Sequence, residues 1–171
     1  MTAPFPKKVT DYLAAVKYGT DAEYVPSSFA LEMLNLIKLI DGGMTENTTP
    51  SIHLKILDSF IDESGKDIIN LCHRGAAKTT LLEYIIFRIA LYGELPNLGK
   101  IPHMIFVGDT VDGGVKKMRK ALEYRFNNSD FLQQYLQEVK FTDIRWECIR
   151  KDGTSVVVSA DGGKTNIRGT R

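Results

Sequence analysis

The sequence of 171 residues lacks most features that would assign it to a specialised class of protein. It has two cysteines, Cys72 and Cys148, and no C-x-x-C pair. We therefore expect neither a disulfide framework nor a zinc site. The formal net charge is +1, so the overall charge gives no sign of binding to nucleic acid or membrane. Any contact with DNA would need a local cluster of basic residues.

Long hydrophobic runs are also missing. The longest apolar stretch, residues 84–92, is interrupted by Arg88 and is shorter than the roughly 20 residues that a membrane span needs. Residues 1–6 contain no apolar core of the kind found in signal peptides. Together with the low cysteine content, these absences predict a soluble intracellular protein in a reducing compartment.

The composition is that of a globular domain, since 43% of the residues are hydrophobic and 25% are charged. Apolar periodicity and capping residues predict helices that alternate with short strands. The predicted helices are residues 7–18, 51–63, 81–91 and 112–126, one that Ser27 or Ser28 caps and that continues to Ile40, and a further one that Ser129 caps. The predicted strands are residues 67–71, 104–107, 144–149 and 154–160. Asp152-Gly153 between the last two predicts a hairpin. This pattern predicts a three-layer α/β fold with a mostly parallel sheet.

The most informative stretch is residues 72–80 (CHRGAAKTT), which separates the predicted strand 67–71 from the predicted helix 81–91. A strand, a loop of small residues carrying Lys-Thr and then a helix is the layout of a phosphate-binding loop. The unpaired N–H groups and partial positive charge of a helix N-terminus attract phosphate, and small residues let the backbone approach it. Lys78 would reach the β and γ phosphates, and the Thr79 hydroxyl would bind Mg²⁺.

The loop departs from the usual pattern G-x-x-x-x-G-K-[ST]. Cys72 and Ala77 occupy the two glycine positions, and Gly75 is the only glycine in the loop. The alternative is an ordinary strand-to-helix turn in which Lys78 has no ligand. A lysine is a poor choice for that role, because cations are unfavourable at a helix N-terminus.

Residues 73–80 (HRGAAKTT) resemble the deviant phosphate loop of phage large terminase subunits, the motors that package DNA into capsids. That family places an arginine four residues before the lysine, where this sequence has Arg74, and tolerates loss of the first glycine. Residues 50–53 (PSIH) are similar to the family's adenine-contacting segment, with His53 where a glutamine is common.

Two later segments resemble segments of this family and occur in the same order along the chain. Residues 104–110, followed by a basic helix, are similar to its next strand–helix unit. Residues 166–171 (NIRGTR), after the hairpin, look like the IRG segment that precedes its second nucleotide motif. The resemblance covers about residues 50–171, and it implies a P-loop NTPase fold.

The resemblance also implies ATP and Mg²⁺ as cofactors. The implied nucleotide contacts are His53, Arg74, Gly75, Ala76, Ala77, Lys78, Thr79 and Thr80, and the implied metal ligand is Thr79. Arg74 would lie beside the γ-phosphate and act in catalysis together with Lys78. Arg168 is either an arginine finger that reaches a neighbouring subunit's nucleotide or a loop arginine paired with a carboxylate.

In that family an apolar strand that ends in Asp, with the catalytic Glu beside it, follows the IRG segment. This sequence ends first. We therefore interpret residues 1–49 as an N-terminal helical segment and residues 50–171 as the N-terminal half of an ATPase domain, without the Walker B strand or the nuclease domain. The chain alone is expected to have little or no ATPase activity.

The complete terminase would form a homo-oligomeric ring in the host cytoplasm, transiently at the procapsid portal. There it would drive double-stranded DNA into the procapsid, with the portal protein and the small terminase subunit as partners. The basic residues Lys116, Lys117, Arg119 and Lys120 would either touch DNA phosphates or form a solvated helix face.

Other interpretations remain open. Asp109 ends an apolar strand and could bind Mg²⁺, but Asp109 or Thr110 as a helix cap is the simpler assignment. The loop could belong to another P-loop enzyme, such as a helicase-like ATPase or a kinase. A third interpretation is a non-catalytic capsid-assembly module, whose N-terminal helices (residues 7–40) dock on a small terminase or portal subunit.

Overall fold

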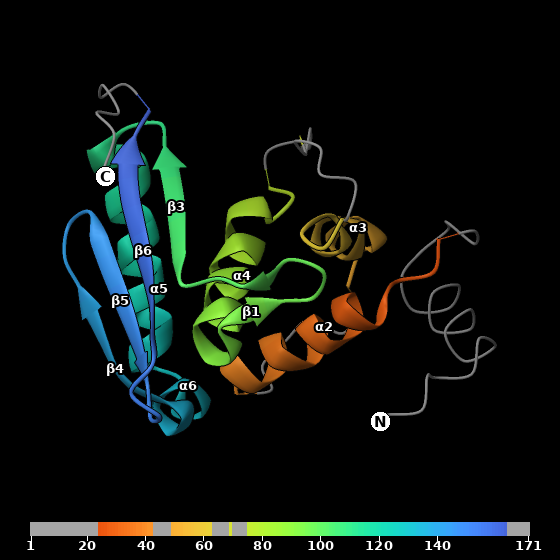
Figure 1. The fold of residues 1–171 in the computed structure, drawn as a ribbon. Helices are drawn as coiled ribbons and strands as arrows, with labels where there is room; N and C mark the ends of the chain where they lie inside the picture. Colours follow the sequence, from red (N-terminus) through yellow and green to blue (C-terminus); the bar gives the residue numbers. More distant parts are fainter. Residues whose placement is uncertain (1–23, 43–48, 63–68, 70–74, 164–171) are drawn as a thin grey trace.

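The computed structural model describes residues 24–42, 49–62, 69 and 75–163 (Figure 1). The predicted helix 7–18 and, apart from residue 69, the predicted strand 67–71 lie outside these residues. The described elements combine helices with a mixed sheet of four strands, which confirms the α/β class. Among the described residues, no helix has both the length and the apolar character needed to cross a membrane.

Two helices pack against each other and are joined by one aspartate. Helix α2 (Ser28–Ile40) begins where predicted, because the Ser27 hydroxyl accepts a hydrogen bond from the backbone N–H of Ala30 at 3.1 Å. Helix α3 (Ser51–Ser59) ends earlier than predicted. Asp58 of α3 accepts hydrogen bonds from the hydroxyls of Tyr24 and Ser27, so it fixes the start of α2 against α3.

Helix α4 (Lys78–Tyr92) is the central helix of the molecule (Figure 1). Its buried side chains are distributed around most of its circumference, which is typical of a helix enclosed by other elements. It contacts α2 and α3 on one side and the sheet on the other. The helix ends at Gly93, whose φ of +75° is the left-handed conformation that commonly ends a helix.

The sheet has the order β3-β6-β5-β4. The parallel pair is β3 (His103–Gly108) with β6 (Ser155–Gly162), and β5 (Arg145–Arg150) runs antiparallel to both β6 and β4 (Leu136–Phe141). The sheet of the described residues is therefore mixed and not mostly parallel. The predicted hairpin is confirmed as β5–β6, whereas β4 was not predicted.

A second, two-stranded sheet follows α4. It pairs β1 (Glu94–Leu95) with β2 (Gly99–Lys100). Its turn contains Asn97, one of two non-glycine residues with positive φ among the described residues.

The segment after β3 begins with a π-helix, η1 (Val111–Val115), which continues into α5 (Lys116–Asn127). Thr110 is the cap, since its hydroxyl accepts a hydrogen bond from the N–H of Gly113 at 2.9 Å. This confirms the capping interpretation of the Asp109-Thr110 pair. Helix α6 (Asp130–Tyr135) follows, capped by Ser129 as predicted.

One face of the sheet forms the core with α5, which runs along it (Figure 1). Trp146, Cys148, Val156 and Val158 alternate with more exposed residues along β5 and β6 and are almost fully buried. Burial raises the pKa of the Cys148 thiol to about 12.

The edge of the sheet at β3 is apolar. Ile105 and Val107 are 67% and 50% exposed. A cavity of about 440 Å³ lies between this strand and α4, and its described lining is apolar.

Candidate functional site

The turn before α4 has an unusual backbone. Gly75 has φ +93°, and Ala77, the residue that precedes the helix, has φ +53° and ψ +19°. This left-handed conformation is uncommon for a residue with a Cβ and is typical of strained functional turns. Ala77 occupies the position of the second glycine in the phosphate-loop pattern. The backbone there has the conformation that glycine favours, although the residue is alanine.

Helix α4 starts with the Lys-Thr pair. The N–H of Leu81 donates to the carbonyl oxygen of Ala77 at 2.9 Å, which closes the first helical turn, and the N-cap residue Ala77 makes no side-chain capping hydrogen bond. Lys78 is half-buried and Thr79 is exposed. A helix N-terminus without a side-chain cap can offer its first N–H groups to an anion. The Thr79 hydroxyl is a hard oxygen ligand, which fits Mg²⁺ bound chiefly by phosphates.

A cavity of about 250 Å³ opens beside this turn, between α2, α3 and the first half of α4. We call it the α2–α3–α4 cavity. It is lined by Leu34, Ile37, Lys38, Asp41, Thr49, His53, Ala77, Thr80, Leu81 and Tyr84. The structure thus brings His53 into the same cavity as Ala77 and Thr80, three of the residues that the sequence predicted for one site.

The other predicted site residues are placed as follows. Gly75 is exposed and Ala76 is buried in the turn. Arg74 and Arg168 lie outside the described residues, so their predicted roles stay predictions.

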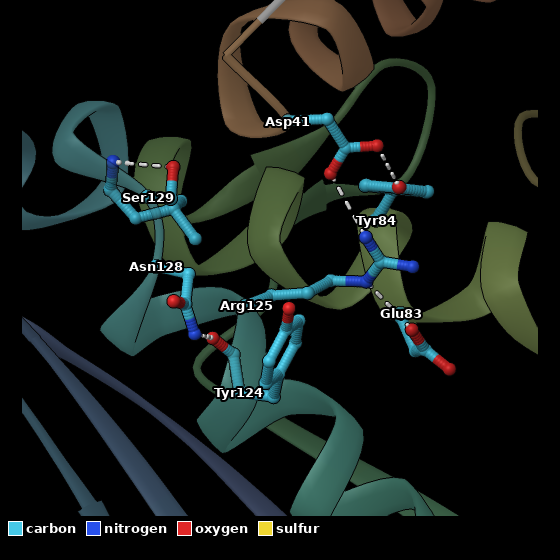
Figure 2. Close-up of polar contacts among 8 residues, drawn as sticks. Asp41, Glu83, Tyr84, Tyr124, Arg125, Asn128 and Ser129 are labelled. Carbon is cyan, nitrogen blue, oxygen red and sulfur yellow. Dashed lines mark hydrogen bonds and ion pairs between the residues drawn. The ribbon is translucent and has the colours of Figure 1, made fainter. Parts of the chain in front are cut away.

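A polar cluster lies at the end of α2 (Figure 2), and two of its residues, Asp41 and Tyr84, line the cavity. Arg125 of α5 donates through Nη1 to Asp41 Oδ1 at 2.9 Å and through Nε to Glu83 Oε2 at 2.8 Å. The Tyr84 hydroxyl donates to the other Asp41 oxygen, Oδ2, at 2.5 Å. The Arg125 guanidinium also lies over the Tyr84 ring, 4.3 Å from its centroid. These contacts join α2, α4 and α5.

The cluster shifts the pKa values of its own groups. Burial and the hydrogen bond to Asp41 raise the pKa of Tyr84 well above its ordinary value. Burial disfavours the charged form of Arg125, but its hydrogen bond to Glu83 and the nearby acidic groups outweigh this and raise its pKa. The tyrosine therefore stays neutral and the arginine stays charged over the physiological pH range.

Sequence reasoning missed Asp41, Glu83, Tyr84 and Arg125. One signal was present: Glu83 stands inside the apolar run of α4, and a charge in an otherwise buried stretch requires a partner. The partner could not be identified, because Arg125 is 42 residues away in the chain.

Some of the basic residues of α5 form ion pairs with acidic residues, which the sequence did not predict. Lys116 pairs with Asp112 at 2.7 Å, and Arg119 lies 4.0 Å from Glu123. Lys117 and Lys120 are exposed. Two of these four basic residues thus have acidic neighbours on the same helical segment.

No protein family, no curated protein and no solved structure matches this chain. Within the residues that the structure describes, no three His, Cys, Asp or Glu side chains are grouped so as to hold a metal ion. The described residues form a mixed α/β fold in which the turn before α4 opens onto a small cavity.

Proposed function

We propose that this chain is the ATP-binding part of a viral DNA-packaging motor of the large terminase type. The observation that carries the proposal is the turn at Ala77, where a residue in the conformation favoured by glycine directly precedes Lys78-Thr79 at the start of α4. The sequence similarity to the terminase loop supports the particular family.

The α2–α3–α4 cavity supports a nucleotide as the ligand. Its volume of about 250 Å³ is below the roughly 300–1,000 Å³ of pockets that enclose a whole ligand, so it suits a base and not a complete nucleotide. The apolar side chains of Leu34, Ile37 and Leu81 can pack against a heterocycle, and His53 and Tyr84 supply aromatic rings. The phosphates would then extend to the N-terminus of α4.

In this arrangement each residue has a separate task. The first N–H groups of α4 and the Lys78 ammonium bind the phosphates, and Lys78 offsets their charge. The Thr79 hydroxyl would hold Mg²⁺, which supplies charge stabilisation for phosphoryl transfer. His53 and Thr80 would orient the nucleoside end.

The test is calorimetric titration of the full chain with ATP, with and without Mg²⁺. We expect binding that Mg²⁺ strengthens and that Lys78→Ala weakens about tenfold or more, because a charged phosphate contact is lost. Lys151→Ala is the control, since Lys151 is an exposed lysine in the hairpin turn. No heat at millimolar ATP would reject the proposal and favour the non-catalytic assembly module.

A second measurement concerns catalysis. The chain alone should show little or no steady ATP hydrolysis, because Asp109 is followed by Thr110 and not by a catalytic Glu. Steady turnover that Lys78→Ala abolishes would contradict this expectation. It would also make Asp109 the candidate for metal binding.

A further inference from the structure

We infer that Arg125 is a positioning residue for the nucleoside end of the ligand, acting through Asp41 and Tyr84. This inference rests on the proposed function. Arg125 itself is not among the residues that line the α2–α3–α4 cavity, whereas Asp41 and Tyr84 both line it. The residue therefore acts on the cavity through its two neighbours.

The geometry leaves the Asp41 carboxylate with little freedom. One oxygen accepts from Arg125 Nη1 and the other from the Tyr84 hydroxyl, so each oxygen has a separate donor on a different helix. Asp41 is the residue that ends α2, and its backbone N–H donates to the carbonyl oxygen of Ile37 at 2.9 Å. The carboxylate is thus held both by its own helix and by α4 and α5.

Arg125 also fixes the position of Tyr84. Its guanidinium lies 4.3 Å from the centre of the Tyr84 ring, on one side, and is held there by the ion pair with the buried Glu83. A planar guanidinium can stack on a ring and bridge two carboxylates at once, whereas a lysine ammonium is a single point charge. Replacing Arg125 by lysine would therefore keep the charge but lose the stacking and the bridge between Asp41 and Glu83.

The consequence is a division of the binding site into two parts. The phosphate part consists of the turn and the start of α4, and it does not contact Arg125 through any described hydrogen bond or ion pair. The nucleoside part consists of the cavity wall, which Arg125 organises. Loss of Arg125 should then weaken binding of a nucleoside triphosphate and leave binding of a bare triphosphate unchanged.

The experiment compares the Mg²⁺ complexes of ATP and of inorganic tripolyphosphate as ligands. Wild-type chain, Arg125→Lys and Tyr84→Phe are titrated with each, and urea unfolding checks that each variant is folded. We expect Arg125→Lys to lose about tenfold in affinity for ATP and less than about twofold for tripolyphosphate. Tyr84→Phe removes only the hydroxyl on Asp41 and should show the same split with a smaller loss for ATP.

Arg88→Lys is the matched control. Arg88 also belongs to an arginine–tyrosine stack on α4, since its guanidinium lies 3.7 Å from the centre of the Tyr92 ring, but it does not line the cavity. This variant should bind both ligands as the wild type does.

The outcomes separate the two proposals. If the wild type binds neither ligand, the proposed function fails and the inference falls with it. If the wild type binds tripolyphosphate as tightly as ATP, the phosphate site stands and the inference is overturned. The inference would also be overturned if the folded variants Arg125→Lys and Tyr84→Phe lost equal affinity for ATP and for tripolyphosphate. It would be overturned as well if they lost affinity for neither ligand. Should Arg125→Lys fail to fold, Tyr84→Phe alone decides between these results.

Discussion

The guanidinium of Arg150 lies against the end of α4, where its Nη1 donates to the carbonyl oxygen of Ala90 at 3.0 Å. Its Nε donates to the Thr154 hydroxyl at 2.7 Å. Carbonyl groups in the last turn of a helix lack intrahelical donors and carry partial negative charge, so a cation is favourable there. One side chain of β5 therefore attaches the hairpin to the central helix.

Replacing Arg150 by methionine should lower the free energy of unfolding by about 1–2 kcal/mol, because a half-buried carbonyl loses its charged donor. Urea unfolding followed by circular dichroism measures this. Arg145→Met is the control, since Arg145 belongs to the same strand but is exposed, and it should cost less than about 0.5 kcal/mol. Equal losses for the two variants would contradict the role given to Arg150.

Gly93 should tolerate alanine less well than Gly153 does. Both have positive φ, +75° and +81°, so each substitution carries the cost of a left-handed alanine, about 1–2 kcal/mol. A Cβ at Gly93 would also lie 3.0 Å from Arg150 Nη1, whereas a Cβ at Gly153 would meet nothing within 4 Å. Thermal unfolding of the two alanine variants should therefore show a larger loss for Gly93→Ala. The difference should shrink when Arg150 is methionine.

Ala77→Gly should stabilise the fold by about 0.5–1 kcal/mol. Glycine removes the steric cost of φ +53°, and this gain exceeds the entropy that glycine adds to the unfolded chain. Ala121→Gly in α5 is the control and should have the opposite sign, a loss of about 1 kcal/mol, because Ala121 lies within a regular helix. A loss at Ala77 of the same size as at Ala121 would show that the turn is not strained in solution.

The hydrogen bond from Tyr84 to Asp41 should make stability fall at high pH. The pKa of Tyr84 is raised in the folded chain, so its contribution is complete below the ordinary value of 10.0. That contribution decreases as the pH rises above 10.0, because the unfolded chain then loses the proton more readily.

Urea unfolding at pH 8 and at pH 10.5 checks this expectation. The decrease between the two pH values should be smaller in Tyr84→Phe than in the wild type. Tyr124→Phe should behave as the wild type, because Tyr124 is 69% exposed. The same slope in all three proteins would contradict the assigned shift.

Elements with a local signal were predictable from the sequence. Ser27 at the start of α2, Thr110 before η1 and Ser129 before α6 each cap a helix, and Asp152-Gly153 forms the hairpin turn. Strand β4 has no such signal. Only Leu136 is buried along it, and Val139 and Phe141 alternate with Lys140 over too few residues to predict a strand, so its conformation comes from pairing with β5.

In the candidate site, too, some residues have a local sequence signal and others do not. Lys78 and Thr79 were predicted from a contiguous pattern, and His53 from the similarity of residues 50–53 to one segment of the terminase family. The Asp41–Tyr84–Arg125 cluster joins residues that are 43 and 84 positions apart, and no periodicity relates them. The sheet is mixed because β4, which was not predicted, adds a second antiparallel pair beside the predicted β5–β6 hairpin.

The buried Cys148 thiol can be used to measure local opening of the sheet. A thiol reagent reacts with the thiolate, and Cys148 is 3% exposed with a pKa raised to about 12. Alkylation of Cys148 at neutral pH must therefore wait until β5 separates from its neighbours. The rate at which Cys148 is alkylated, resolved from Cys72 by peptide mass, reports how often this half of the sheet opens under native conditions.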